Sequence, residues 1–171
     1  MIPASAIADR VDELARRISH DHAGVEDLLM VGVLRGSYVF LADLTRRLTV
    51  PCAVDFVSLS QYDRGSLPMG SVRLAMDVRV DIKSRHVVIV EDIVSSGCTL
   101  SYLVKMFEIR EPASLRTCVL VRKRGHENTA VRLDYVGFEI PDRWVVGYGL
   151  DYDNKYRTLP YIGVVHAPDT D

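Results

Sequence analysis

Cysteine is scarce in this sequence of 171 residues, and no two cysteines form a CxxC pair. Cys52, Cys98 and Cys118 are odd in number and widely spaced, which supports neither a zinc site nor a disulfide framework. We therefore expect three reduced thiols in a cytoplasmic protein.

An excess of one charge is also absent, since 21 Lys and Arg stand against 23 Asp and Glu, a formal net charge of −2. Nucleic-acid-binding domains usually carry a basic excess, so we expect no nucleic acid partner. No apolar run is long enough to cross a bilayer, and the N-terminal MIPASAIADR carries an acid early. The sequence therefore predicts no signal peptide and no membrane partner.

Segments typical of strands and of helices alternate along most of the chain. Ile7, Val11, Leu14 and Ile18 recur at helical spacing, with Ser5 as the expected N-cap. Further helices are expected at 38–48 and 99–110, and strands at 28–34, 53–60, 71–78, 86–90 and 114–121. This alternation predicts an α/β fold with a mostly parallel central sheet flanked by helices. The short strands expected after residue 133 do not fit this alternation of strands and helices. We expect a single domain over 1–171, with a small hood from about 134–171 and the N-terminal segment.

Two adjacent acids, Glu91 and Asp92, follow the apolar run 86–90. Open parallel sheets bind ligands beyond the carboxyl ends of their strands, where this pair is expected. Neighbouring carboxylates repel each other and are costly to bury without partners. A metal ion or the hydroxyls of a sugar would explain both acids. The alternative is that one acid caps the next helix and the other is solvated.

The next residues, Ser95-Ser96-Gly97-Cys98-Thr99, form a small hydroxyl-rich turn at the start of a predicted helix. Amide groups at a helix N-terminus favour an anion, and glycine lets the backbone approach it closely. The turn therefore predicts a phosphate cradle, although an ordinary capped helix start has a similar composition. Because no Walker lysine is present, a sugar phosphate is expected rather than a nucleoside triphosphate to be hydrolysed.

The stretch VVIVEDIVSSGCTL, residues 87–100, resembles the phosphoribosyl-pyrophosphate motif of the type I phosphoribosyltransferases. VGVLRGS (31–37), VDFVSLSQY (54–62), the lysine of VRKR (121–124) and VGFEIPDRWVVGYGLDYDNKYRTLPYIGVV (136–165) resemble the hypoxanthine-guanine group of that family. The resemblance covers nearly the whole chain in one register. It implies the type I phosphoribosyltransferase fold.

The resemblance also implies a reaction of purine salvage. Hypoxanthine or guanine, each a 6-oxopurine base, displaces pyrophosphate from phosphoribosyl pyrophosphate and yields the purine nucleoside monophosphate, IMP or GMP. Mg²⁺ is the implied cofactor, and a homodimer or homotetramer is the implied assembly. An oxocarbenium-like transition state is expected, as in glycoside chemistry. The site then has to hold the ring, neutralise the leaving pyrophosphate and exclude water.

By the same resemblance, each matching residue takes a role. Catalysis is implied for Glu91, Asp92, Ser95 and Lys123, and magnesium ligation for Glu91, Asp92 and Asp151. The 5′-phosphate would be bound by Ser96, Gly97, Cys98 and Thr99, the pyrophosphate by Leu34, Arg35, Gly36 and Arg157, and the purine by Lys123, Trp144, Val145 and Asp151. A mobile lid is implied over 61–70, beginning at Gln61 and Tyr62. The family has a non-proline cis peptide in the pyrophosphate turn. Taken alone, Trp144 would be a half-buried core residue, Lys123 part of a solvated edge and Asp151 part of a turn.

Three positions depart from the family pattern: Arg35 replaces a lysine, Gln61 a serine, and Ser95 an aspartate assigned as general acid/base near purine N7. A serine hydroxyl can hydrogen-bond N7 but cannot act as a carboxylate base at neutral pH. General acid–base help is typically worth ~10²–10⁴-fold in rate. Three readings follow: a slow hypoxanthine-guanine enzyme, which we favour, a xanthine-preferring enzyme, or a catalytically weak nucleotide-binding homologue.

Overall fold

The computed structural model describes residues 2–61, 72–125 and 131–165. The helices are α1 (Ala4–Asp21), α2 (Tyr38–Thr45) and α3 (Cys98–Glu108). The strands are β1 (Leu28–Leu34), β2 (Cys52–Gln61), β3 (Val72–Met76), β4 (His86–Val94), β5 (Ser114–Lys123), β6 (Tyr135–Ile140), β7 (Val145–Val146) and β8 (Gly163–Val164). Among these residues, no helix is long and apolar enough to cross a membrane.

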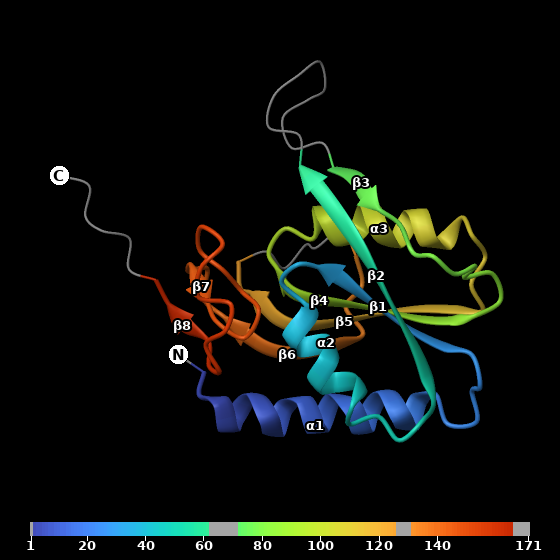
Figure 1. Ribbon diagram of the computed structural model, residues 1–171, viewed down its shortest axis with the longest axis horizontal. Helices are drawn as coiled ribbons and strands as arrows, with labels where there is room; N and C mark the ends of the chain where they lie inside the picture. The colour runs from blue at the N-terminus through green and yellow to red at the C-terminus, as the bar shows by residue number, and fades with distance from the viewer. Residues whose placement is uncertain (1, 62–71, 126–130, 166–171) are drawn as a thin grey trace, which may run out of the picture.

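The main sheet has the strand order β3-β2-β1-β4-β5-β6 (Figure 1). All neighbouring strands pair in parallel except β2 and β3, which are antiparallel. Helices connect β1 to β2 and β4 to β5, as parallel pairing requires. The predicted α/β class with a mostly parallel, helix-flanked sheet is therefore confirmed.

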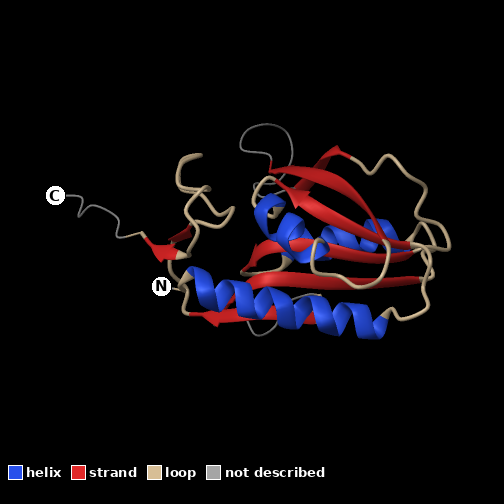
Figure 2. Ribbon diagram, turned by 60° about the horizontal axis from the view of Figure 1, so that its bottom comes forward, coloured by secondary structure: helices blue, strands red, loops and turns tan. Residues whose placement is uncertain are grey.

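Two apolar cores lie on the two faces of this sheet. Leu28 and Met30 of β1 pack with α1 and α2, whereas Leu29 and Val31 pack with α3. Successive strand residues point to opposite faces, which explains why both sets in LLMVGVL are apolar. Figure 2 shows α1 running along one face of the strands.

The predicted inner face of α1 is buried, but its N-cap is Pro3 rather than Ser5. The helix begins one residue before Ser5, and Ile7 donates its amide to the Pro3 carbonyl at 3.1 Å. Proline suits a helix start because its missing N–H would have no partner there. The prediction of Ser5 as N-cap was therefore wrong.

Two strand predictions also need correction. β4 continues through Glu91 and Asp92 to Val94, because its backbone keeps pairing with β5 as far as Arg122. β6 belongs to the main sheet, where it pairs with β5, and not to the hood expected from about residue 134. The two-stranded β7–β8 sheet follows it, and Ile2 exchanges backbone hydrogen bonds with Ile162 at 2.8 and 3.0 Å.

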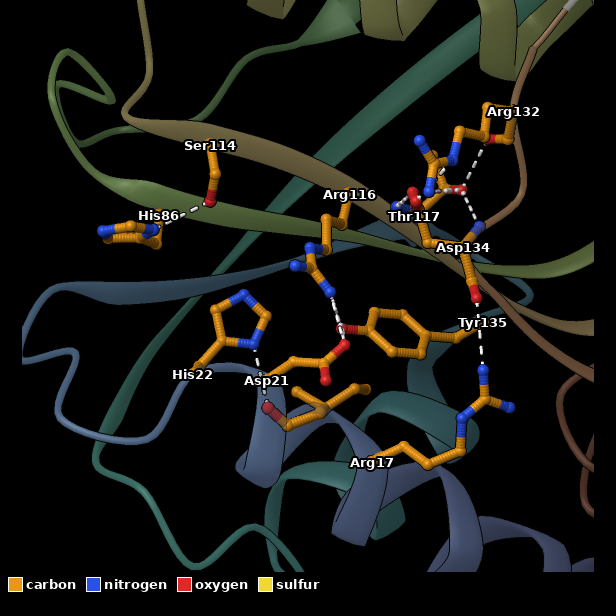
Figure 3. Close-up of polar contacts among 11 residues, drawn as sticks. Arg17, Asp21, His22, His86, Ser114, Arg116, Thr117, Arg132, Asp134 and Tyr135 are labelled. Carbon is orange, nitrogen blue, oxygen red and sulfur yellow. Dashed lines mark hydrogen bonds and ion pairs between the residues drawn. The ribbon is translucent and has the colours of Figure 1, made fainter.

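A polar network connects α1 to the amino-terminal end of the sheet, where β5 and β6 begin (Figure 3). The Tyr135 hydroxyl donates to Asp21 at 2.7 Å and accepts from Arg116 at 2.7 Å, while Arg116 pairs with Asp21. Burial raises the pKa of Tyr135, so its proton stays in place. The network ties the end of α1 to β5 and β6, and we assign it to the fold.

Candidate active site

Three distant segments meet at Gly36, just beyond the carboxyl end of β1. A Cβ atom added to Gly36 would overlap the carboxylate of Asp92, and one added to Gly149 would overlap the Gly36 carbonyl oxygen. Gly149 also has a φ of +102°, a conformation that side chains rarely adopt. The turn at 34–36, strand β4 and the hood, which is residues 141–165 with β7 and β8, can therefore touch because glycine stands at both positions. The peptide between Leu34 and Arg35 is cis, as the resemblance implied.

The two acids of β4 sit in an unfavourable electrostatic setting. Oε2 of Glu91 is buried and has no hydrogen-bond partner, and Asp92 is buried as a whole. Burial, and secondly the neighbouring Asp92 charge, hold the pKa of Glu91 well above its ordinary value. Burial also raises the pKa of Asp92, against the opposing effects of hydrogen bonds and of the Arg157 charge. Among the described residues, the hydrogen bonds to Asp92 and the Arg157 charge therefore do not offset this burial, and a further cation would favour two full charges.

Arg157 contacts two other residues of the hood, Gly149 and Asp151, close to Gly36. Its Nη1 donates to the Gly149 carbonyl at 2.7 Å, and its Nη2 pairs with Oδ1 of Asp151 at 2.7 Å. In the part of the chain that the structure describes, no group of three His, Cys, Asp or Glu side chains could hold a metal ion. The predicted ligands Glu91, Asp92 and Asp151 thus do not form a three-carboxylate site, and Asp151 is paired with Arg157.

The predicted phosphate loop lies directly after β4 and opens into a cavity of about 230 Å³ lined by residues 91–100. Gly97 is the N-cap of α3 with a φ of +75°, and the Ser101 amide donates to its carbonyl at 2.8 Å. Ser95, Ser96 and Cys98 are exposed at the mouth. The N-terminus of α3 therefore borders a solvent-accessible hollow, a suitable place for an anion.

Lys123 and Trp144 come together at the far end of β5. The Lys123 ammonium lies 5.6 Å from the centroid of the Trp144 ring and 2.8 Å from Oδ1 of Asp142. Trp144 is 68% exposed and is therefore not a core residue. The Tyr152 ring lies edge-on to the Trp144 ring, with 6.3 Å between the ring centroids. An exposed indole beside a cation offers a flat face to an aromatic ligand. Val145 is buried and pairs with Val164.

Two polar partners of the predicted site residues were not predicted from the sequence. Asp142 pairs with Lys123, and Asn154 Oδ1 accepts a hydrogen bond from Nη2 of Arg35 at 2.7 Å. Asp142 lies two residues before Trp144 in EIPDRW, but no periodic signal distinguishes it from a turn acid. For the predicted lid, Gln61 ends β2, while Tyr62 and the loop to residue 70 lie outside the described residues.

The fold and these clusters agree with comparisons to known proteins. The family model of the phosphoribosyl transferase domain matches residues 3–153, and the chain belongs to the phosphoribosyltransferase family. Hypoxanthine phosphoribosyltransferase of Salmonella typhimurium is 43% identical over 166 residues, or 96% of this chain and 93% of that protein. Hypoxanthine-guanine phosphoribosyltransferase of Dictyostelium discoideum is 42% identical over 160 residues, or 92% and 89%.

A solved hypoxanthine-guanine phosphoribosyltransferase from Bacillus anthracis has a TM-score of 0.90 at 39% identity and covers 97% of each chain. A structure of the asparagine mutant at an invariant aspartic acid of these enzymes has a TM-score of 0.91 at 41% identity, covering 97% of this chain and 91% of that one. The branch of the family to which this chain belongs is therefore that of the hypoxanthine and hypoxanthine-guanine phosphoribosyltransferases.

Proposed function

We propose that this protein transfers the phosphoribosyl group of phosphoribosyl pyrophosphate to hypoxanthine or guanine, giving IMP or GMP and pyrophosphate in purine salvage. The observation that carries the proposal is the junction at Gly36. It brings a backbone turn, two acids and an arginine together beside a loop suited to a phosphate. The whole of residues 1–171 acts as one domain in this proposal.

The residues divide between the two ends of the substrate. The loop of Ser96, Gly97, Cys98 and Thr99 takes the 5′-phosphate, because these residues line the cavity after β4 at the N-terminus of α3. Glu91 and Asp92 accept hydrogen bonds from the ribose hydroxyls. The turn of Leu34, Arg35 and Gly36 holds the pyrophosphate with its amides and the Arg35 guanidinium, and Arg157 adds positive charge from the hood.

The acid pair also fits Mg²⁺. Glu91 Oε2 is buried without a partner, and burial raises the pKa of both acids, so a nearby positive charge would stabilise their charged forms. Magnesium is usually held by one or two carboxylates, its own waters and substrate phosphates, so a third acid is not required. Asp151 joins the set only if it leaves Arg157. When bound, the ion would neutralise charge on the departing pyrophosphate.

The purine base takes the exposed face of Trp144, with Lys123 donating to its 6-oxygen and the Val145 backbone meeting its edge. Ser95 lies at the mouth of the phosphate loop and offers only a hydroxyl toward N7. Since no carboxylate takes the N7 proton there, we expect slow turnover driven by positioning and electrostatics. A homodimer or homotetramer is part of the proposal and is tested by light scattering after gel filtration.

Product formation from each of four bases tests this function. Purified protein is incubated with phosphoribosyl pyrophosphate, Mg²⁺ and hypoxanthine, guanine, xanthine or adenine, and nucleotides are separated by chromatography. IMP and GMP should form, and Asp92→Asn or chelation of the metal should suppress them. If xanthine were the best substrate, the proposed preference for hypoxanthine or guanine would be wrong. If none of the 6-oxopurines gave a product, the activity itself would be refuted.

A further inference from the structure

The strand register places Asp142 beside Lys123. Lys123 is the last residue of β5 and is paired with Ile140, the last residue of β6. Pro141 follows, and the chain turns so that Oδ1 of Asp142 lies 2.8 Å from the Lys123 ammonium. The Lys123 side chain is only 15% exposed, whereas the Asp142 side chain is 58% exposed. The contact therefore fixes an almost buried cation from its solvent side.

An ammonium group on a four-carbon stem has three donors and little intrinsic direction. Here the Asp142 carboxylate accepts one donor, and the ring of Trp144 lies 5.6 Å from the same nitrogen. These two contacts restrict the rotation of the ammonium and leave donor capacity for a ligand stacked on Trp144. A 6-oxo group can accept from it, whereas a 6-amino group presents donors of its own.

We propose that Asp142 is a positioning and specificity-determining residue, which aims Lys123 at the 6-substituent of the purine and so favours an oxo group over an amino group. The inference rests on the proposed function and extends it to a residue outside the assigned site. Asp142 itself does not touch the base. It acts through the orientation of Lys123, since a site organised to donate rejects a ligand that cannot accept.

Asp142→Asn removes the charge while keeping the size of the side chain. We expect the KM for hypoxanthine to rise about tenfold, since hydrogen bonds to charged groups contribute that order of affinity. The KM for phosphoribosyl pyrophosphate should change by less than about twofold, and the ratio of kcat/KM for hypoxanthine over adenine should fall. Because Asp142 is the largely exposed partner of the pair, its loss should lower the melting temperature by less than about 4 °C. Asp142→Glu, which keeps the charge, should recover part of the loss.

Glu139→Gln is the matched control. Glu139 pairs with Arg122 at 3.3 Å, and these two residues precede Ile140 and Lys123 on the same two strands. The control removes an equivalent carboxylate without touching Lys123, so it should leave every KM unchanged. An equal effect of both substitutions would mean that the net charge of the sheet edge matters, and it would overturn the positioning role.

A direct binding measurement separates this inference from the activity. Trp144 is the sole tryptophan, so quenching of its emission by IMP reports occupancy of the base site alone. Asp142→Asn should weaken IMP binding about tenfold relative to wild type and to Glu139→Gln. Unchanged IMP affinity, or an unchanged preference for hypoxanthine over adenine, would refute the proposal. If the wild type bound IMP but formed no product, the proposed function would fail while the role of Asp142 would still be decided.

Discussion

Replacing Glu91 by glutamine should stabilise the free protein while it damages the site. Oε2 of Glu91 is buried without a partner, and the adjacent Asp92 makes a second charge unfavourable. Glutamine has nearly the same size, carries no charge and can donate a hydrogen bond to Asp92. Glu91→Gln therefore removes the electrostatic penalty of the unliganded site without opening a cavity.

The magnitude follows from the burial. A buried polar group without a partner costs about 1–3 kcal/mol, and more when it is charged. In a domain of this size, each 1 kcal/mol moves the melting temperature by about 2–4 °C. We therefore expect Glu91→Gln to melt about 2–12 °C above wild type at about pH 8 without metal or substrate.

The direction in which wild-type stability changes with pH follows from the raised pKa of Glu91. Folded protein binds the proton more tightly than unfolded protein does, so wild-type stability falls as pH rises from about 4.5 through the higher folded pKa. The difference between Glu91→Gln and wild type should therefore be largest at alkaline pH and should shrink as Glu91 is protonated.

Calorimetry from about pH 4.5 to 8.5 measures this difference, with the exposed Glu108→Gln as the control. Addition of Mg²⁺ with phosphoribosyl pyrophosphate should stabilise wild type more than the variant. A variant that melts below wild type at alkaline pH, or a difference that does not depend on pH, would refute the reasoning.

Three further substitutions test other parts of the site. Ser95→Asp should raise kcat about 10²-fold or more with unchanged IMP affinity in the fluorescence titration, because it supplies the missing base; an unchanged kcat would show that Ser95 does not limit the rate. Arg157→Lys keeps the charge but not the two-armed contact with Gly149 and Asp151, so the KM for phosphoribosyl pyrophosphate should rise about tenfold while that for hypoxanthine stays constant. Gly149→Ala places a methyl group on the Gly36 carbonyl, and both kcat and melting temperature should fall; wild-type behaviour in both assays would show that the hood is free to shift.

Much of the fold follows from local patterns. The apolar spacing in residues 7–18 identifies the buried face of α1, and the run at 28–34 identifies a strand buried on both sides. The residues at which strands end are harder to predict from the sequence, as β4 shows. Two acids after an apolar run suggest the end of a strand, yet β4 pairs with β5 beyond them, at Ile93 and Val94. A single sequence does not display that pairing.

The candidate site divides in the same way. Glu91, Asp92 and the loop after them are contiguous, so their proximity could be predicted. The contacts of Gly36 with Asp92 and Gly149 join residues far apart in sequence, and only the family resemblance linked their segments. The pairing of Lys123 with Asp142 depends on the register of β5 and β6, which no composition or spacing reveals.

Two groups that the fold leaves without full partners, Glu91 and Trp144, are among those assigned to substrate. Glu91 has an unpartnered buried oxygen, and Trp144 exposes two thirds of its surface although it is the largest aromatic residue in the chain. In the network of Asp21, Arg116 and Tyr135, by contrast, the polar groups have partners within the protein. Substrate and metal would supply the missing partners, so binding should stabilise the fold through these residues. Substitutions that relieve the unliganded state, such as Glu91→Gln, should therefore reduce the stabilisation gained on binding, which links the thermal measurements to the activity.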